Sequence, residues 1–278
     1  MQHPFAMPPS VRVPTDYRGV WVRTRSLSSA DPAGATPSDA SPVWARWLQT
    51  SLWHAELRVP HEAMVGRVAA PLSTFDSDQL AALTHQRGVA GCTRVDAHPQ
   101  GELCSWLRRI DYQPPSLSPD AAWVVFDAPH RMVRIDQHSE LSETWERLPD
   151  SLGVFRVLSG VDDRGQPDGR LLLQAGVHLC LVRDRRRPWP RGLNPGLALV
   201  DVLLAQPEHA VAWLDQEVSF GRLDGAHWCI ERSTLPEREG LRLPCSMVRW
   251  RVSDEADVTL GADTSRWQVL EWTDDLDR

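Results

Sequence analysis

The chain has 278 residues, of which 42% are hydrophobic, so it is long enough to bury the core of one large domain or of two ordinary ones. Its 37 acidic side chains outnumber its 30 basic ones, giving a formal net charge of -7, which argues against a dedicated nucleic-acid-binding protein. All the basic side chains except histidine are arginine, and this lack of lysine excludes a lysine Schiff base, a lysine general base and a phosphate-loop lysine.

The five cysteines are odd in number and form no C-x-x-C pair, which predicts reduced, mostly buried thiols and neither a disulfide framework nor a zinc ribbon. The opening residues lack a basic segment followed by an apolar run, and eighteen consecutive apolar residues occur nowhere, so we expect a cytoplasmic protein without a membrane span. The scarcity of Lys, Asn and Ile is typical of a GC-rich, bacterial genome. No G-x-S-x-G or G-x-G-x-x-G motif indicates a hydrolase or a dinucleotide cofactor.

Short alternating segments dominate the first half of the chain. A Pro-rich lead is followed by a strand at 16–24, an exposed loop at 26–42 rich in Ser, Ala, Pro, Gly and Asp, and a strand at 44–60 that ends at a proline. Residues 77–88 form the clearest helix, with Ser77 or Asp78 as its N-cap and Gly88 at its C-terminal end. Further strands are predicted at 89–96, 102–113, 122–128, 132–137 and 142–148.

The second half repeats this order. Strands are predicted at 154–161, 169–176 and 178–184, then an Arg/Pro-rich loop, a helix at 196–206, and strands at 210–223, 226–235, 247–253, 257–260 and 266–272. The segments CSWLRRIDYQP and WCIERSTLP, one from each half, are both Trp-led strands that carry an inner Arg and stop at a proline. We therefore predict a mostly β protein with an internal duplication: two tandem antiparallel barrels, each with one short helix, over residues 1–150 and 151–278 with a boundary at 149–153.

Several of these segments resemble a known group of proteins. YRGVWVRT, WLQTSLWHAELRVP, QRGVAGCT, CSWLRRIDYQP and WLDQEVSFGRL-x-x-x-HWCIERSTLP are similar to recurring segments of poorly characterised two-barrel, lipocalin-like or calycin-like proteins, which include a fungal casein-kinase interactor. The resemblance covers most of the chain and departs in the loops at 26–42 and 183–191. It implies a pair of antiparallel barrels and supplies no catalytic residue.

The first candidate site lies on the strand predicted at 44–60. With a period of two, His54, Glu56 and Arg58 share one face, while Trp47 and Trp53 share the other. Turned inward, the polar trio forms a cluster for an anionic or carboxylate-bearing ligand, with Arg58 as a fork of donors. Turned outward, it is solvated, and the tryptophans on the other face are core. The sequence leaves both orientations open.

The strand predicted at 102–113 and its counterpart at 226–235 carry further candidates. Trp106 and Arg108 alternate on the former, where they form either an amphipathic pocket wall or part of an internal salt bridge; Trp228 and Arg232 occupy the latter. The thirteen tryptophans of the chain either line a pocket for a planar ligand or fill the core between layers.

Two other clusters invite a different chemistry. His227, Cys229 and Glu231 share a strand face, but alternate strand residues stand too far apart to bind one tetrahedral metal ion easily, so we expect neither a metal nor a cysteine nucleophile there. The loop at 183–191 concentrates positive charge before a helix, and is either solvated or a dock for a phosphate or an acidic protein partner. Its arginines are Arg183, Arg185, Arg186, Arg187 and Arg191.

Three functions remain. The favoured hypothesis is a non-enzymatic binding protein that holds a small, partly apolar, acidic ligand in a barrel, with Trp walls and Arg58 or Arg108 fixing the acidic group. The first alternative is a protein-interaction module whose barrels are filled by side chains. The second alternative is an enzyme with Glu56 or Glu231 as general acid/base at a barrel mouth, although no catalytic motif converges on either residue.

Overall fold

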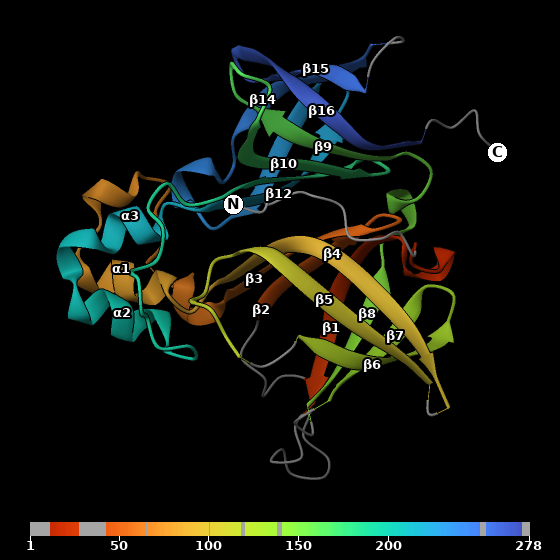
Figure 1. Ribbon diagram of the computed structural model, residues 1–278, viewed down its shortest axis with the longest axis horizontal. Coiled ribbons are helices and arrows are strands. Elements are labelled where there is room, and N and C mark those ends of the chain that lie inside the picture. Colours follow the sequence, from red (N-terminus) through yellow and green to blue (C-terminus); the bar gives the residue numbers. More distant parts are fainter. Residues whose placement is uncertain are drawn as a thin grey trace.

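The computed structural model describes residues 12–27, 43–64, 66–99, 101–117, 120–137, 141–250 and 254–273. These residues form two closed antiparallel barrels, packed against each other with a layer of short helices at one side (Figure 1). The strands of the first barrel are β1 (Gly19–Leu27), β2 (Val43–Gln49), β3 (Trp53–Pro60), β4 (Arg87–His98), β5 (Gly101–Asp111), β6 (Ala121–Ala128), β7 (Arg131–Asp136) and β8 (Ser142–Arg147). The strands of the second are β9 (Phe155–Val161), β10 (Pro167–Ala175), β11 (His178–Arg183), β12 (Glu217–Asp224), β13 (His227–Ser233), β14 (Arg242–Arg249), β15 (Glu255–Leu260) and β16 (Asp263–Thr273).

The two barrels share one plan, which confirms the predicted duplication. In each, strands adjacent in the chain are hydrogen-bonded neighbours, the last strand closes onto the first, and the helical segment follows the third strand. The register slips at Gly91 where β4 meets β5, and at Gly221 where β12 meets β13. A Cβ on either glycine would lie 2.1 Å from a carbonyl oxygen of the facing strand, so the same bulge requires glycine in both halves.

One predicted strand is a hairpin. The segment at 44–60 forms β2 and β3, which turn at residues 50–52 and pair antiparallel. Trp47 lies opposite Glu56, and residues directly opposite in a ladder project to the same side of the sheet. The single alternation predicted across the whole segment was therefore wrong: Trp47 shares the face of Glu56, whereas Trp53 does not.

Other elements shift or change type. Helix α1 (Ser77–Leu83) is capped by Asp76, whose side chain accepts from the backbone N–H of Gln79, and Gly88 lies within β4. The helix predicted at 196–206 is α2 (Leu199–Ala205). The start of the strand predicted at 210–223 is instead α3 (Ala210–Leu214), so the second half has two short α-helices where one was predicted. Most of the loop predicted at 26–42 and the end of the strand predicted at 247–253 lie outside the described residues.

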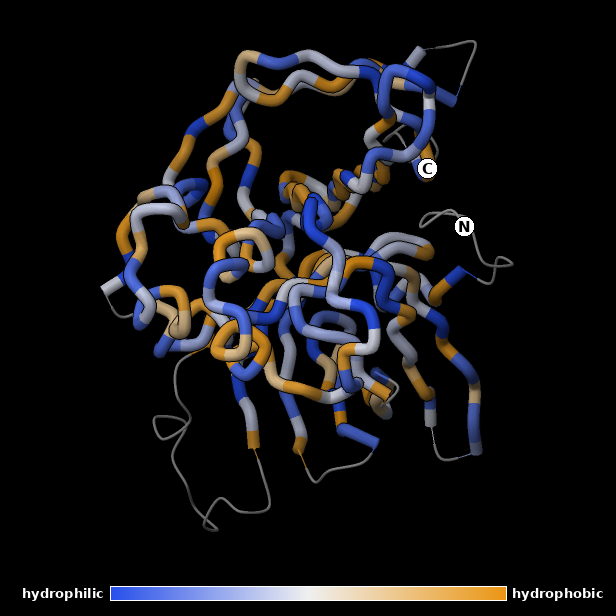
Figure 2. Tube along the Cα trace, turned by 60° about the vertical axis from the view of Figure 1, so that its left-hand side comes forward, coloured by the Kyte–Doolittle hydropathy of each residue, from blue (hydrophilic) through white to orange (hydrophobic). Residues whose placement is uncertain are grey.

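The barrels meet through the outer faces of their early strands. Along these strands, residues that face the other barrel alternate with residues that face the strand's own barrel interior. Figure 2 shows hydrophobic (orange) and hydrophilic (blue) stretches interspersed along the chain. Trp53, Leu57, Val157, Leu173 and Phe220 are among the buried side chains of this contact. The link between the barrels contains the 3-10 helix Pro149–Ser151, where the boundary was predicted; the division into two domains stays a prediction.

The short helices cover one side of this junction. Leu83 of α1, Leu203 of α2 and Trp213 of α3 pack in one cluster with Tyr112, which follows β5. The helices thus seal the end of the contact nearest to β5, where the candidate site opens.

Candidate functional site

The interior of the first barrel is lined by both charged and aromatic side chains. Along β3, Trp53, Ala55, Leu57 and Val59 face the second barrel, so the intervening His54, Glu56 and Arg58 face inward. Trp47, Trp106 and Trp145 face the same interior, because each lies opposite an inward-facing residue of the neighbouring strand. The inward orientation of the polar trio is the one that the structure shows.

Five charged side chains form an ion-pair chain across the barrel. Glu143 on β8 accepts from Arg58 Nη1 at 2.6 Å and Nη2 at 3.0 Å, and from Arg23 Nη1 at 2.8 Å. Glu56 accepts from Arg58 Nε and, at 3.2 Å, from Arg134 Nη1. Because both carboxylates are buried, each needs these partners to remain ionised.

Arg134 is enclosed by three tryptophans. Its guanidinium carbon lies 4.0 Å from the ring centroid of Trp106, 4.9 Å from that of Trp145 and 5.2 Å from that of Trp47. The flat cation stacks favourably on the negative faces of the rings. Arg134 is therefore the central side chain of this aromatic cluster.

The arginines set the protonation of the acids. Burial alone would raise the pKa of Glu56, but the charges of Arg58, Arg134 and Arg87 outweigh it and hold that pKa well below its ordinary value. Burial opposes ionisation of Glu143 in the same way, and Arg58 and Arg134 still lower its pKa to about 2. Glu56 is thus a fixed anion and a poor proton donor, which argues against the general-acid alternative. Glu231 is exposed on the outer wall.

His54 is held by a short chain of hydrogen bonds. Its Nδ1 lies 3.1 Å from Thr93 Oγ1, which donates to Gln49 Oε1 at 2.7 Å. Gln49 directs both N–H bonds of its amide to the carbonyl oxygens of Thr50 and Trp53. His54 Nε2 is buried and has no hydrogen-bond partner among the described residues. Burial is the main cause that lowers the pKa of His54, to about 4, so the ring is neutral at pH 7.

One interior cation among the described residues forms no direct ion pair, although the carboxylates of Glu56 and Asp120 act on it from beyond contact distance. Arg23, Arg58, Arg108 and Arg134 each form an ion pair, but no hydrogen bond or ion pair joins Arg87 to another described residue. Arg87 lies opposite Arg58 on the neighbouring strand, so both project inward. Burial, followed by the charge of Arg58, lowers the pKa of Arg87. The indole N–H groups of Trp47 and Trp106 are also buried without an acceptor.

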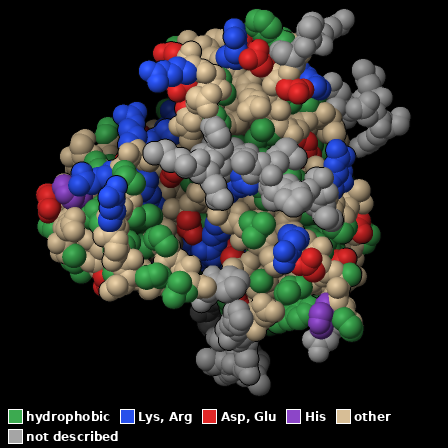
Figure 3. Space-filling model, in the orientation of Figure 1, with side chains coloured by type: hydrophobic (Ala, Val, Ile, Leu, Met, Phe, Trp, Pro, Cys, Tyr) green, Lys and Arg blue, Asp and Glu red, His purple; other side chains and the backbone are tan. Residues whose placement is uncertain are grey.

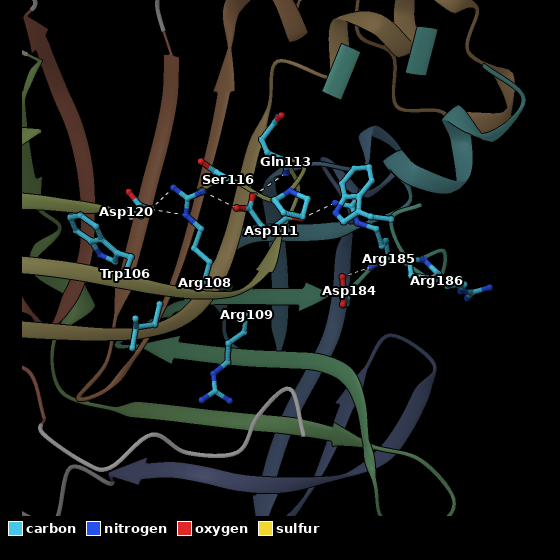
Figure 4. A pocket seen from close by; sticks show the side chains of 14 residues that line it. Trp106, Arg108, Arg109, Asp111, Gln113, Ser116, Asp120, Asp184, Arg185 and Arg186 are labelled. Carbon is cyan, nitrogen blue, oxygen red and sulfur yellow. Dashed lines mark hydrogen bonds and ion pairs between the residues drawn. The ribbon is translucent and has the colours of Figure 1, made fainter. Parts of the chain in front are cut away.

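A cleft of about 760 Å³ adjoins this interior, because Trp106 and Arg108 line it. It follows the edge of β5 where pairing with β6 has ended, and loop 184–189 of the second half forms its far wall (Figure 4). Arg108 points to one side, bonded to Asp111 and Asp120 at 2.8 Å each, while Arg109 points to the other. In Figure 3 acidic and basic side chains are visible in the recess between the helices and the first barrel. Asp120 and Arg108 act electrostatically on both His54 and Arg87, which places the cleft beside the interior cluster.

The predicted site residues therefore separate into groups. Trp47, His54, Glu56, Arg58 and Trp106 come together inside the first barrel, and Arg108 lies at its side opening; that they bind a ligand remains a prediction. The other three lie elsewhere. Trp53 is buried between the barrels, Trp228 lies within the second barrel, and Arg232 lies opposite Phe220 on the wall that faces the first barrel.

The sequence prediction omitted several members of this interior: Arg23, Arg87, Arg134, Glu143 and Trp145. The alternation of RMVRID and SETWER was a usable signal, because Met132 and Arg134 share one face and Glu143 and Trp145 another. Which of these faces turns inward depends on the closure of the barrel, which a single strand does not reveal.

The interior of the second barrel is different in kind. Leu158, Leu172, Leu179, Ile230 and Val258 fill it together with Trp228 and Trp267. Trp228 packs so closely on the backbone of Gly221 that a Cβ there would lie 2.6 Å from the indole nitrogen. The described interior of this barrel is thus mainly apolar, and whether side chains fill it completely stays a prediction.

The arginine loop is partly structural. Arg185 is buried, stacks 3.8 Å from the ring centroid of Trp189, and donates to the carbonyl oxygens of Trp213, Asp111 and Tyr112 and to Gln216 Oε1. It joins the two halves of the chain and is not available to a partner, whereas Arg186 and Arg187 are exposed. Helix α2 begins at Leu199, well after the loop, and has no side-chain cap.

The described part of the chain contains no group of three His, Cys, Asp or Glu side chains arranged to hold a metal ion. His227 and Cys229 alternate with the inward-facing Trp228 and Ile230, so they lie on the outer wall of the second barrel. Among the described helices, none combines the length and apolarity that crossing a membrane requires. Comparison with protein-family models, with curated proteins and with solved structures gives no match to this chain.

Proposed function

We propose that the protein is a non-enzymatic binding protein that holds a small, partly apolar anion in the first barrel, entered through the cleft beside β5. The observation that carries this proposal is Arg87, an inward-facing, half-buried cation without a direct ion pair among the described residues, in an interior where the other arginines are paired. Glu56 and Asp120 act on its charge only from beyond contact distance, and an anionic ligand would provide a direct partner. We also propose that the protein is lipocalin-like. Its first barrel has eight antiparallel strands in chain order, and lipocalins are up-and-down barrels of eight strands.

Aromatic surface near the cation supports a ligand with an apolar, planar body. Trp106 lines both the cleft and the interior, and Trp189 stands on the opposite wall of the cleft. The indole N–H groups of Trp47 and Trp106 add two donors without acceptors. The cleft volume falls within the range of about 300–1,000 Å³ that is typical of small-molecule sites. The proposal is restricted to the first barrel because its interior carries the charged side chains, whereas the cluster within the second is apolar.

Titration of the purified protein with 2-naphthoate, followed by calorimetry and by tryptophan fluorescence, tests the proposal. We expect saturable binding that Arg87→Met weakens about tenfold or more, because a hydrogen bond to a charged group contributes about 1.5–3 kcal/mol. Arg94→Met is the matched control, since Arg94 is exposed on the same strand. Absence of binding by 2-naphthoate and by a panel of fatty and aromatic acids would refute the proposal and favour the interaction module with filled barrels.

A protein partner at the loop 183–191 is a separate proposal, now restricted to its exposed arginines. Arg186 and Arg187 extend into solvent beside the cleft. A pull-down with the Arg186→Ala/Arg187→Ala variant, which leaves Arg185 intact, tests this dock. Undiminished capture by the double variant would count against it.

A further inference from the structure

The hydrogen bonds around His54 fix which ring nitrogen carries the proton. Gln49 uses its N–H bonds on two carbonyl oxygens, so its Oε1 must accept the proton of the Thr93 hydroxyl. Thr93 then has only a lone pair to offer His54, and Nδ1 of His54 must be the donor. In a neutral imidazole the other nitrogen is then bare. His54 Nε2 is therefore a buried acceptor without a donor.

Two side chains that line the cleft lie near His54. His54 is 1% exposed and faces inward. Arg108 and Asp120 line the cleft, and both act electrostatically on His54. Gly91, opposite His54 on β4, provides no opening, because a Cβ there would lie 2.1 Å from the carbonyl oxygen of Leu107. A donor for Nε2 therefore has to come from the barrel interior.

We infer that His54 Nε2 accepts a hydrogen bond from the ligand, so that the first barrel selects an anion that also carries a hydroxyl or N–H group. This inference rests on the proposed function and narrows it. Arg87 and His54 lie on neighbouring strands, separated by four residues along the ladder, which corresponds to about 13 Å of strand. The acidic group and the donor are accordingly at opposite ends of the ligand, as on a two-ring aromatic acid.

Three probes that differ at one position test the inference: 6-hydroxy-2-naphthoate, 6-methoxy-2-naphthoate and 2-naphthoate. All three have the acid and the rings, but only the first has a donor at the far end. We expect wild-type protein to bind the hydroxy acid about tenfold more tightly than the other two, the effect of one additional well-formed hydrogen bond.

Two substitutions at His54 separate its two nitrogens. In His54→Asn the side-chain amide occupies the place of Nδ1 and can still contact Thr93, but nothing replaces Nε2. In His54→Gln the longer amide reaches the place of Nε2 and can present its oxygen to the ligand. The preference for the hydroxy acid should disappear in the Asn variant and persist in part in the Gln variant, while 2-naphthoate binds equally to both.

The outcomes are distinguishable from failure of the proposed function. Binding of all three acids with equal affinity, or a full hydroxyl preference in folded His54→Asn, would overturn the inference and leave the anion site in place. Failure of every probe to bind would overturn the proposed function itself. If His54→Asn does not fold, Thr93→Val provides the second variant, because it removes the group that orients the ring, and the preference should fall. NMR of the ring nitrogens in the free protein gives an independent readout: a proton on Nε2 would contradict the assignment.

Discussion

The neutral, buried His54 makes the stability of the protein depend on pH in a definite window. The pKa of a histidine in an unfolded chain is about 6.5, whereas burial lowers the pKa of His54 in the folded protein to about 4. Between these values the unfolded chain binds a proton that the folded protein does not. The free energy of unfolding therefore decreases as the pH falls from about 6.5 towards 4.

The size of the effect follows from the two pKa values. Linkage gives a loss of about 2 kcal/mol between pH 7 and pH 5, and about 3 kcal/mol once the folded form also titrates. Asp120, Glu56, Arg108 and Arg134 are the charged groups that act on His54. They are common to wild type and to a His54→Asn variant, so the difference between the two proteins isolates the imidazole.

Urea unfolding at pH 7, 6 and 5, followed by circular dichroism, measures this difference. We expect the stability of wild type to decrease by about 2 kcal/mol more than that of His54→Asn over this range. His85→Gln, at an exposed histidine, serves as the control and should follow wild type. Parallel pH profiles for wild type and His54→Asn would refute the picture of a neutral imidazole held in the barrel.

Three further variants test the packing of the two halves and of the charged interior, each by urea unfolding. Glu56→Gln leaves buried arginine charge uncompensated and should cost about 3 kcal/mol, and an effect under 1 kcal/mol would contradict the buried ion pairs. Arg185→Met should cost about 3 kcal/mol and exposed Arg187→Met less than about 0.5 kcal/mol; equal effects would argue against Arg185 as the link between the halves. Gly88→Ala places a Cβ 2.8 Å from Val218 Cγ2 and should cost about 1–3 kcal/mol, part of which Val218→Ala should restore; strictly additive effects would contradict that contact.

The overall plan could be predicted because it depends on local patterns. Short alternating segments, turn residues between them and the paired Trp-led strands predicted two antiparallel barrels, which the structure confirms. The type of one segment could not be predicted locally. Ala210–Leu214 is helical because Ala210, Trp213 and Leu214 pack on the other short helices. The amino-acid composition of this segment does not predict that tertiary contact.

The site was predictable in part for a similar reason. Alternation placed His54, Glu56 and Arg58 on one face of β3 but left open whether that face turns inward. Trp47 was assigned to the wrong face because the turn at 50–52 carries none of the usual Gly, Pro or Asn signals. Arg87 was not singled out, since nothing local distinguishes it from a solvated arginine. Its importance arises only from its ladder position opposite Arg58, which requires knowledge of strand register.

Arg185 also bears on how the two similar halves have come to differ. Its guanidinium bonds to carbonyl oxygens of both halves, so the wall of the cleft is made jointly by them. One of the two similar barrels has a charged interior and the other a mainly apolar one, and among the described residues the cleft adjoins the charged barrel. The second half, whose barrel interior is apolar, supplies the wall of the cleft that faces the first barrel. If either half were replaced by a second copy of the other, the protein would lose either the charged interior or the opposite wall of the cleft. The two halves are therefore no longer interchangeable, although they share one plan.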